Sequence, residues 1–157
     1  MLPPGIAFLS LSNVAANLSP ELAALKSQIE GSLILFDIGS AAIGPIRRGA
    51  LDSVSTAFLR LSAATGRLGY QADLELFGRA DTTGTDATNE NLSRARVDAV
   101  GARLVGLGIR SDAWSGVPLG VSKPLPGRDG IDQAQVNRSV AFTVHVRREA
   151  SGPEGPR

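Results

Sequence analysis

The sequence of 157 residues contains no cysteine, one histidine and few aromatic residues. Without cysteine the chain has no disulfide, no thiolate metal site and no cysteine nucleophile. The single histidine, His145, argues against a metal site built from several histidines. Aromatic residues make up 4% of the chain and the net charge is +1, too little for stacking platforms or a basic field that would bind DNA or RNA. We therefore expect no cofactor, no metal and no nucleic-acid partner.

Long apolar runs are also missing. No stretch approaches the roughly 20 apolar residues that a membrane-spanning helix needs. The first residues lack the basic region and the apolar region of a signal peptide. Two interpretations stay open: a cytoplasmic protein, or a piece of a longer exported chain. In the second case, contact with a membrane would come only through segments absent from this chain.

The residues that are present are typical of a globular domain with its own core. Hydrophobic residues make up 43% of the chain and charged residues 20%. Ser19-Pro20-Glu21 has the features of a helix start: a capping serine, a proline in the first helical position and an acid in the first turn. Leu22, Leu25 and Ile29 follow at helical spacing, and Gly31 ends the run.

The rest of the chain alternates strand-like segments with two long amphipathic segments. Strands are indicated by short apolar or alternating runs, and helices by apolar residues repeated at helical spacing. In chain order we predict a strand at 32–36, a helix at 50–68, a strand at 72–77, a helix at 91–107, and strands at 113–119 and 139–146. Long helices between strands require crossover connections. The order predicts an α+β fold with a mixed sheet and helices packed on it.

Three parts are predicted along the chain. Residues 1–31 form an N-terminal extension with a strand at 6–14 and the short helix. This extension is either the end of an upstream domain or a helix packed on the main domain. Residues 32–148 form the main domain, and residues 149–157, rich in glycine and proline, form a disordered tail.

A polar, threonine-rich stretch from Gly78 to Val97 carries the candidate binding residues. Asp81 follows the end of a predicted strand, where open sheets tend to place their ligands. Asn89, Ser93 and Arg96 are spaced by four and three residues, so they share one face of a helix that begins beside Asp81. A carboxylate and a guanidinium on two sides of one pocket complement a zwitterion. Asp81 would take the ammonium and Arg96 the carboxylate.

Residue types alone leave other interpretations open. Opposite charges such as Asp81 and Arg96 beside a loop more often form a structural salt bridge, and an aspartate there can organise its own turn. Catalysis has little support, because no Ser-His-Asp triad can be built around His145. Arg79 would also keep a neighbouring carboxylate ionised, which does not suit a general acid. Trp114 is more often a packing residue than a platform for sugars.

The same stretch resembles the OmpA-like peptidoglycan-binding domain family, which includes domains of OmpA, the Pal lipoprotein and MotB. The family pattern includes a Gly-His-Thr-Asp loop, and its first and last residues match Gly78 and Asp81 of this chain. The residues that match in register after it are Gly84, Asn89, Leu92, Ser93 and Arg96. Further matches are Phe36-Asp37, Gly120, Pro124 and Asn137-Arg138. The resemblance covers residues 32–146, and the matches are specific as a set rather than one by one.

The resemblance implies a two-layer βαβαββ sandwich with helices on one face of the sheet. It also implies that the chain is not an enzyme and binds the peptidoglycan stem peptide non-covalently through diaminopimelate. The implied ligand-binding residues are Asp81, Arg96, Asn89, Thr82, Gly84, Leu92 and Arg138. The implied location is the periplasm or cell envelope, with outer-membrane association in the full-length protein and other envelope proteins as candidate partners.

The chain departs from the family pattern near the expected site. Arg79-Ala80 replaces a His-Thr pair, which removes a hydroxyl beside Asp81 and adds a cation. Ser139 stands where a second arginine is usual, and residues 39–42 lack a frequent asparagine. These departures motivate an alternative, an OmpA-like domain that has lost wall binding and serves as a protein-interaction or assembly module. An enzyme that acts on the wall is the least supported hypothesis.

Overall fold

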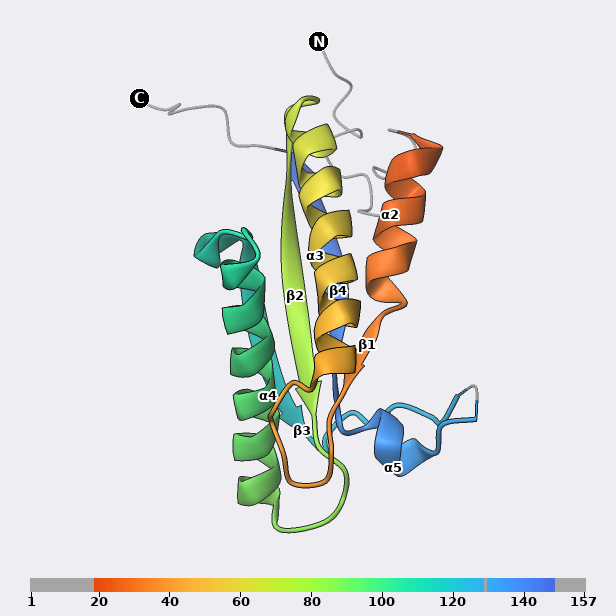
Figure 1. Cartoon of the computed structure of the whole chain (residues 1–157), viewed down its shortest axis with the longest axis vertical. Coiled ribbons are helices and arrows are strands. Elements are labelled where there is room, and N and C mark those ends of the chain that lie inside the picture. Colours follow the sequence, from red (N-terminus) through yellow and green to blue (C-terminus); the bar gives the residue numbers. More distant parts are fainter. Residues whose placement is uncertain (1–18, 129, 149–157) are drawn as a thin grey trace.

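The computed structural model describes residues 19–128 and 130–148 as a sheet with helices packed on one face (Figure 1). In chain order the elements are α2 (Pro20–Glu30), β1 (Leu33–Leu35), α3 (Pro45–Gly66), β2 (Tyr70–Arg79), α4 (Asp86–Gly106), a 3-10 turn (Ser111–Ala113), β3 (Trp114–Gly120), α5 (Gln133–Val136) and β4 (Ser139–Arg148). The strand predicted at 6–14 and the tail predicted at 149–157 lie outside the described residues.

The sheet has four strands in the order β1-β4-β2-β3. Strand β4 is antiparallel to both β1 and β2, whereas β3 is parallel to β2 after the crossover through α4. From β1 onward the strands and long helices follow the order βαβαββ, so the predicted α+β fold with a mixed sheet is confirmed. The short helix α5, between β3 and β4, was not predicted.

Helix α4 begins earlier than the sequence predicted, at Asp86 rather than at Asn91. The Thr85 side chain accepts a hydrogen bond from the Thr88 amide at 3.1 Å and so caps the helix. Asp86 lies in the first turn, where a negative charge favours the helix dipole. The polar residues 78–89 favour a loop by residue type alone, but residues 86–89 form the first turn of α4.

The core lies between the sheet and the helices. Strand β2 alternates buried and half-buried residues, so that Ala72, Leu74 and Leu76 face the helices. Helix α2 contributes to the same core through Leu22, Leu25 and Ile29. Among the described residues, no helix has the length and apolar character needed to cross a membrane.

Helix α4 packs unusually close to the sheet because glycines face it. A Cβ atom added at Gly78 on β2 would overlap the carbonyl oxygen of Ser93. A Cβ at Gly116 on β3 would overlap Val97 in the same way. The family-motif glycine at position 78 therefore serves the close approach of a helix rather than the flexibility of a loop. This close packing brings the next turn of α4, with Arg96, against the end of β2.

Candidate ligand-binding site

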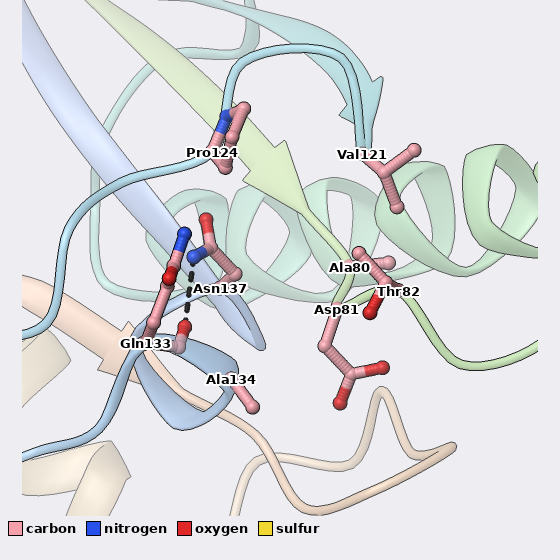
Figure 2. A pocket seen from close by; sticks show the side chains of 8 residues that line it. All are labelled: Ala80, Asp81, Thr82, Val121, Pro124, Gln133, Ala134 and Asn137. Carbon is pink, nitrogen blue, oxygen red and sulfur yellow. Dashed lines mark hydrogen bonds between the residues drawn. The ribbon is translucent and has the colours of Figure 1, made fainter.

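A pocket of about 270 Å³ lies where β2 ends, bounded by the β2–α4 loop, the β3–α5 loop and helix α5 (Figure 2). Its lining residues are Ala80, Asp81, Thr82, Val121, Pro124, Gln133, Ala134 and Asn137. The strand-end position predicted a ligand site at Asp81 and the family resemblance implied Thr82 beside it; both residues line the pocket. Within the ranges that the structure describes, no group of three or more acidic or histidine side chains is arranged to hold a metal ion.

Asp81 supplies an ionised carboxylate to this pocket. Its Oδ2 accepts a hydrogen bond from Arg138 Nη1 at 2.9 Å, and its Oδ1 accepts one from the Thr83 amide at 3.0 Å and another from the Thr83 hydroxyl. The residue is 8% exposed. Burial by itself would raise the pKa of Asp81, but the hydrogen bonds from Thr83 and Arg138 outweigh it and lower the pKa below its usual value.

Three of the four or so lone-pair directions of the Asp81 carboxylate are thus occupied. The direction that remains, on Oδ2, allows the same carboxylate to accept one more hydrogen bond. The contacts with Thr83, two residues on, are those of an aspartate that organises its own turn. The turn-forming role and an acceptor role in the pocket are therefore compatible.

Arg96 lies on the interior side of the same strand end. Its Nε donates to the Ser40 carbonyl at 2.9 Å, Nη1 to the Arg79 carbonyl at 3.0 Å and Nη2 to the Asp37 carbonyl at 3.1 Å. The side chain is 0% exposed, and its guanidinium lies 5.3 Å from the centre of the Phe36 ring. Arg96 therefore ties the β1–α3 loop to the last residue of β2.

The charge of Arg96 persists in this interior position. Burial lowers its pKa to about 10, the positive charge of Arg138 lowers it as well, and the negative charge of Asp81 acts in the opposite direction. Arg96 remains protonated at neutral pH because a pKa of about 10 is well above 7. Backbone carbonyls, rather than a carboxylate, accept the hydrogen bonds of the Arg96 guanidinium.

The salt bridge that residue types suggested between Asp81 and Arg96 is absent from the described residues; Asp81 pairs with Arg138 instead. Of the two residues predicted to lie on two sides of one pocket, Asp81 lines it and Arg96 does not. The physical reason is that the carbonyls of the β1–α3 loop converge on the guanidinium and hold it in the interior. A direct contact between Arg96 and a ligand stays a prediction.

The other predicted residues divide between the pocket and its supports. Arg138 reaches the site through its pair with Asp81. Gly84, with φ +88°, Asn89, which is buried, and Leu92, which is half-buried, do not line the pocket. They shape the β2–α4 loop and the start of α4, and a Cβ at Gly84 would lie 3.6 Å from Oδ1 of Asn89.

Asn137 is the main residue of the pocket that the prediction did not include. Its Nδ2 donates to the carbonyls of Leu125 and Gln133, each at 2.8 Å, and its Oδ1 accepts from the Leu125 amide at 2.8 Å. These bonds fasten the β3–α5 loop to α5 across one side of the pocket. Asn137 and Pro124 matched the family pattern, so that signal was present, whereas no motif marked Val121, Gln133 or Ala134.

The two departures at Arg79 and Ser139 lie directly opposite each other on β2 and β4. Arg79 donates from Nε to the Lys123 carbonyl at 2.6 Å and does not fill the pocket. Burial lowers the pKa of the Arg79 guanidinium. Ser139 is buried, and its hydroxyl has no hydrogen-bond partner among the residues of the described ranges.

No family model matches the chain. Over 94 residues, 60% of the chain, the sequence is 32% identical to outer membrane protein A of Atlantibacter hermannii. It is 31% identical over the same length to outer membrane protein A of Citrobacter freundii. The match spans 36% and 37% of those two proteins, so the chain covers little more than a third of their length.

Solved structures share the fold at lower identity. The peptidoglycan-associated lipoprotein of Burkholderia pseudomallei aligns with a TM-score of 0.63 and 24% identity, over 80% of this chain and 99% of that one. A putative MotB-like protein of Desulfovibrio vulgaris aligns with a TM-score of 0.61 and 20% identity, over 92% of this chain and 97% of that one. The homologues match the resemblance that the motif indicated, and the described residues share the fold of the OmpA-like structures.

Proposed function

We propose that this domain is a peptidoglycan-associated module of the cell envelope that binds the stem peptide without cutting it. The observation that carries the proposal is an ionised, partly satisfied aspartate, Asp81, in the wall of a pocket at a strand end. The homology to outer membrane protein A and the fold shared with a peptidoglycan-associated lipoprotein support the choice of ligand.

Diaminopimelate suits this pocket because its second amino-acid centre carries an ammonium group. That ammonium would donate to the remaining lone pair of Asp81 Oδ2 and form a charge-assisted hydrogen bond. Thr82, which is exposed beside Asp81, offers a hydroxyl at the same wall. Asp81 would be the primary contact, with Arg138 holding its carboxylate in position.

We propose binding rather than cleavage because Asp81 is held as an ionised carboxylate with a lowered pKa. A general acid in glycoside hydrolysis needs a raised pKa, whereas the pKa of Asp81 is lowered. We therefore expect that incubation with purified sacculi releases no soluble wall fragments. Release of muropeptides or stem peptides above a heat-treated control would revive an enzymatic role.

We further propose that the domain works in the periplasm, as part of a longer envelope protein that reaches the outer membrane. The chain covers little more than a third of outer membrane protein A from Atlantibacter hermannii, and that protein's name places it in the outer membrane. The other hypothesis, a domain without wall binding, would gain support from a side chain that blocks the pocket. Arg79 is held on the Lys123 carbonyl and does not line the pocket, so the structure gives that hypothesis no support.

Co-sedimentation with sacculi tests the proposal. Wild-type protein should pellet with sacculi that contain diaminopimelate, and Asp81→Asn should stay in the supernatant because the substitution removes the charge but keeps the size. Asp98→Asn, an equal change at an exposed position on α4, is the matched control and should pellet like wild type. Equal pelleting of wild type and Asp81→Asn, with both folded, would overturn the proposed site.

A further inference from the structure

The outer edge of β4, on the side of β1, is only partly covered by the residues that the structure describes. Strand β4 has ten residues and pairs with β2 along its whole length, whereas β1 pairs only with residues 139–141. Beyond β1 the outer edge of β4 continues from residue 142 to residue 148. No neighbouring strand lies along this stretch within the described ranges.

Alternate residues of β4 direct their backbone groups toward this outer edge. The Arg138 carbonyl, just before β4, accepts a hydrogen bond from the Phe36 amide at 2.7 Å, and the Val144 amide donates to Glu30 Oε2 at 2.9 Å. Val146 is separated from Val144 by one residue, so its amide and carbonyl point to the same edge. Among the described residues they have no hydrogen-bond partner there.

The backbone groups of Val146 are nevertheless withdrawn from solvent. Val146 is 1% exposed as a whole residue, which leaves almost no accessible area for its amide and carbonyl. Enclosed backbone groups in proteins are nearly always hydrogen-bonded, because leaving one unpaired costs the free energy of its lost hydration. The partner of Val146 is therefore either a bound water or a segment of chain outside the described residues.

We propose that residues 6–14 of this chain form a strand beside Val146 at the outer edge of β4. Figure 1 shows that α2 begins and β4 ends at the same end of the molecule. The chain from residue 14 to Ser19, which caps α2, covers about 17 Å when it is extended. A segment tethered so close meets this edge at a high effective concentration, which favours it over a strand from another molecule.

The sequence of the segment matches the two faces of the sheet at this edge. Leu9 and Leu11 alternate with Ser10 and Ser12, which is the period of a strand with one apolar face. On β4, Val146 and its alternate neighbours lie in the same core as the apolar residues of α2, and the residues between them are half-buried or exposed. In the proposed strand the leucines extend that core, and the serines lie on the face of the sheet without helices.

Cysteine cross-linking of the 157-residue chain tests the placement, because the chain has no cysteine of its own. His145→Cys or Arg147→Cys on β4 is combined with Ser10→Cys or Ser12→Cys. Under mild oxidation at least one of these pairs should form a disulfide within one molecule, since neighbouring strands bring Cα atoms within the roughly 4.4–6.8 Å that a disulfide needs. The matched control combines the same serine changes with Ser115→Cys on β3, at the opposite edge of the sheet, and should form no cross-link.

Amide hydrogen exchange tests the hydrogen bond itself. In the variant Leu9→Pro/Ser10→Pro neither substituted residue can donate from its backbone nitrogen. Adjacent residues of a strand direct their backbone groups to opposite sides, so one of the two prolines must interrupt the proposed pairing. Exchange of the Val146 amide should become at least about tenfold faster, whereas the amide of Val140, which is paired with β1, should keep its rate.

The control for exchange is the tail variant Ser151→Pro/Gly152→Pro, which should behave like wild type. Cross-links only between molecules would assign the edge to a second copy of the chain and overturn the proposal. It is also overturned if no pair links to β4 within one molecule, or if Val146 exchanges equally fast in wild type and in Leu9→Pro/Ser10→Pro, the result expected for a bound water. Neither measurement involves the wall ligand, so these outcomes leave the proposed function untouched.

Discussion

The two sides of the β2 end use charged side chains in opposite ways. On the interior side, Arg96 is withdrawn from solvent and holds backbone carbonyls from two segments of the chain. On the pocket side, Asp81 and Arg138 form an ion pair in which the carboxylate retains a free lone pair next to a pocket. The interior side therefore supports the fold, and the pocket side offers groups to a ligand. Substitutions on the interior side should mainly lower stability, and those on the pocket side should mainly weaken binding.

The largest expected effect is the loss of the interior guanidinium. Arg96→Met keeps most of the volume but leaves the carbonyls of Asp37, Ser40 and Arg79 without donors. We expect a loss of about 3–5 kcal/mol in the free energy of unfolding, measured by urea denaturation, because buried polar groups become unsatisfied. Arg94→Met, exposed on the same helix, should change it by less than about 0.5 kcal/mol. An Arg96→Met protein of wild-type stability that no longer binds sacculi would instead make Arg96 a direct ligand contact.

The second effect concerns the close packing that brings Arg96 to the strand end. Gly78→Ala places a methyl group against the Ser93 carbonyl and should destabilise the fold by about 1–3 kcal/mol. Gly49→Ala in α3 is the control, since a Cβ there meets nothing within 4 Å. The Gly49→Ala substitution should stabilise the protein by about 0.5–1 kcal/mol. Thermal unfolding of both variants and of wild type measures the two effects. A neutral Gly78→Ala would show that α4 can move away from the sheet at no cost.

Asn137 tests the pocket side with a smaller expected effect. Asn137→Ala removes three hydrogen bonds that join Leu125 and Gln133. We expect about 2 kcal/mol less stability and weaker peptide binding, because the β3–α5 loop loses its attachment. Asn91→Ala, exposed on α4, should leave both quantities unchanged. Unchanged binding in a folded Asn137→Ala protein would show that this loop does not shape the ligand site.

Substitution of Asp81 should have the smallest effect on stability, and this effect should depend on pH in a direction that the lowered pKa predicts. Its pKa is lower in the folded protein than in the unfolded chain, so its ionised form stabilises the fold above the unfolded pKa of roughly 3.9. That contribution disappears as the pH falls through the lowered folded pKa. Urea unfolding between pH 2.5 and 7 should show a steeper acid loss for wild type than for Asp81→Asn. Parallel curves would contradict the shift, and Asp98→Asn should follow wild type.

Local pattern was enough to predict much of the fold. Alternation in β2 and β4, and the apolar spacing of the long helices, identified the sheet and the crossovers because these signals lie within one element. The start of α4 was misplaced because threonines favour loops and caps alike. Thr85 can be recognised as a cap only when the residues after it are known to form a helix.

The site was predictable in position but not in the roles of its arginines. Helical spacing showed that Asn89, Ser93 and Arg96 share a face, and a strand end indicated where Asp81 lies. The depth of Arg96 depends on carbonyls of Asp37 and Ser40, which are 59 and 56 residues away in the sequence. Contacts of such sequence separation follow from tertiary packing, and no local pattern in the sequence records them.

The central claim is that the stem peptide binds at the ionised Asp81 in the pocket. Titration of ¹⁵N-labelled protein with the diaminopimelate tripeptide, followed by amide chemical shifts, tests it most directly. The account predicts the largest shifts at Thr82, at Thr83, whose amide donates to Asp81, and at Val121 on the facing wall. Asp81→Asn should abolish these shifts. Shifts confined to another surface, such as the α2–α3 groove around Leu25 and Thr56, would contradict the claim.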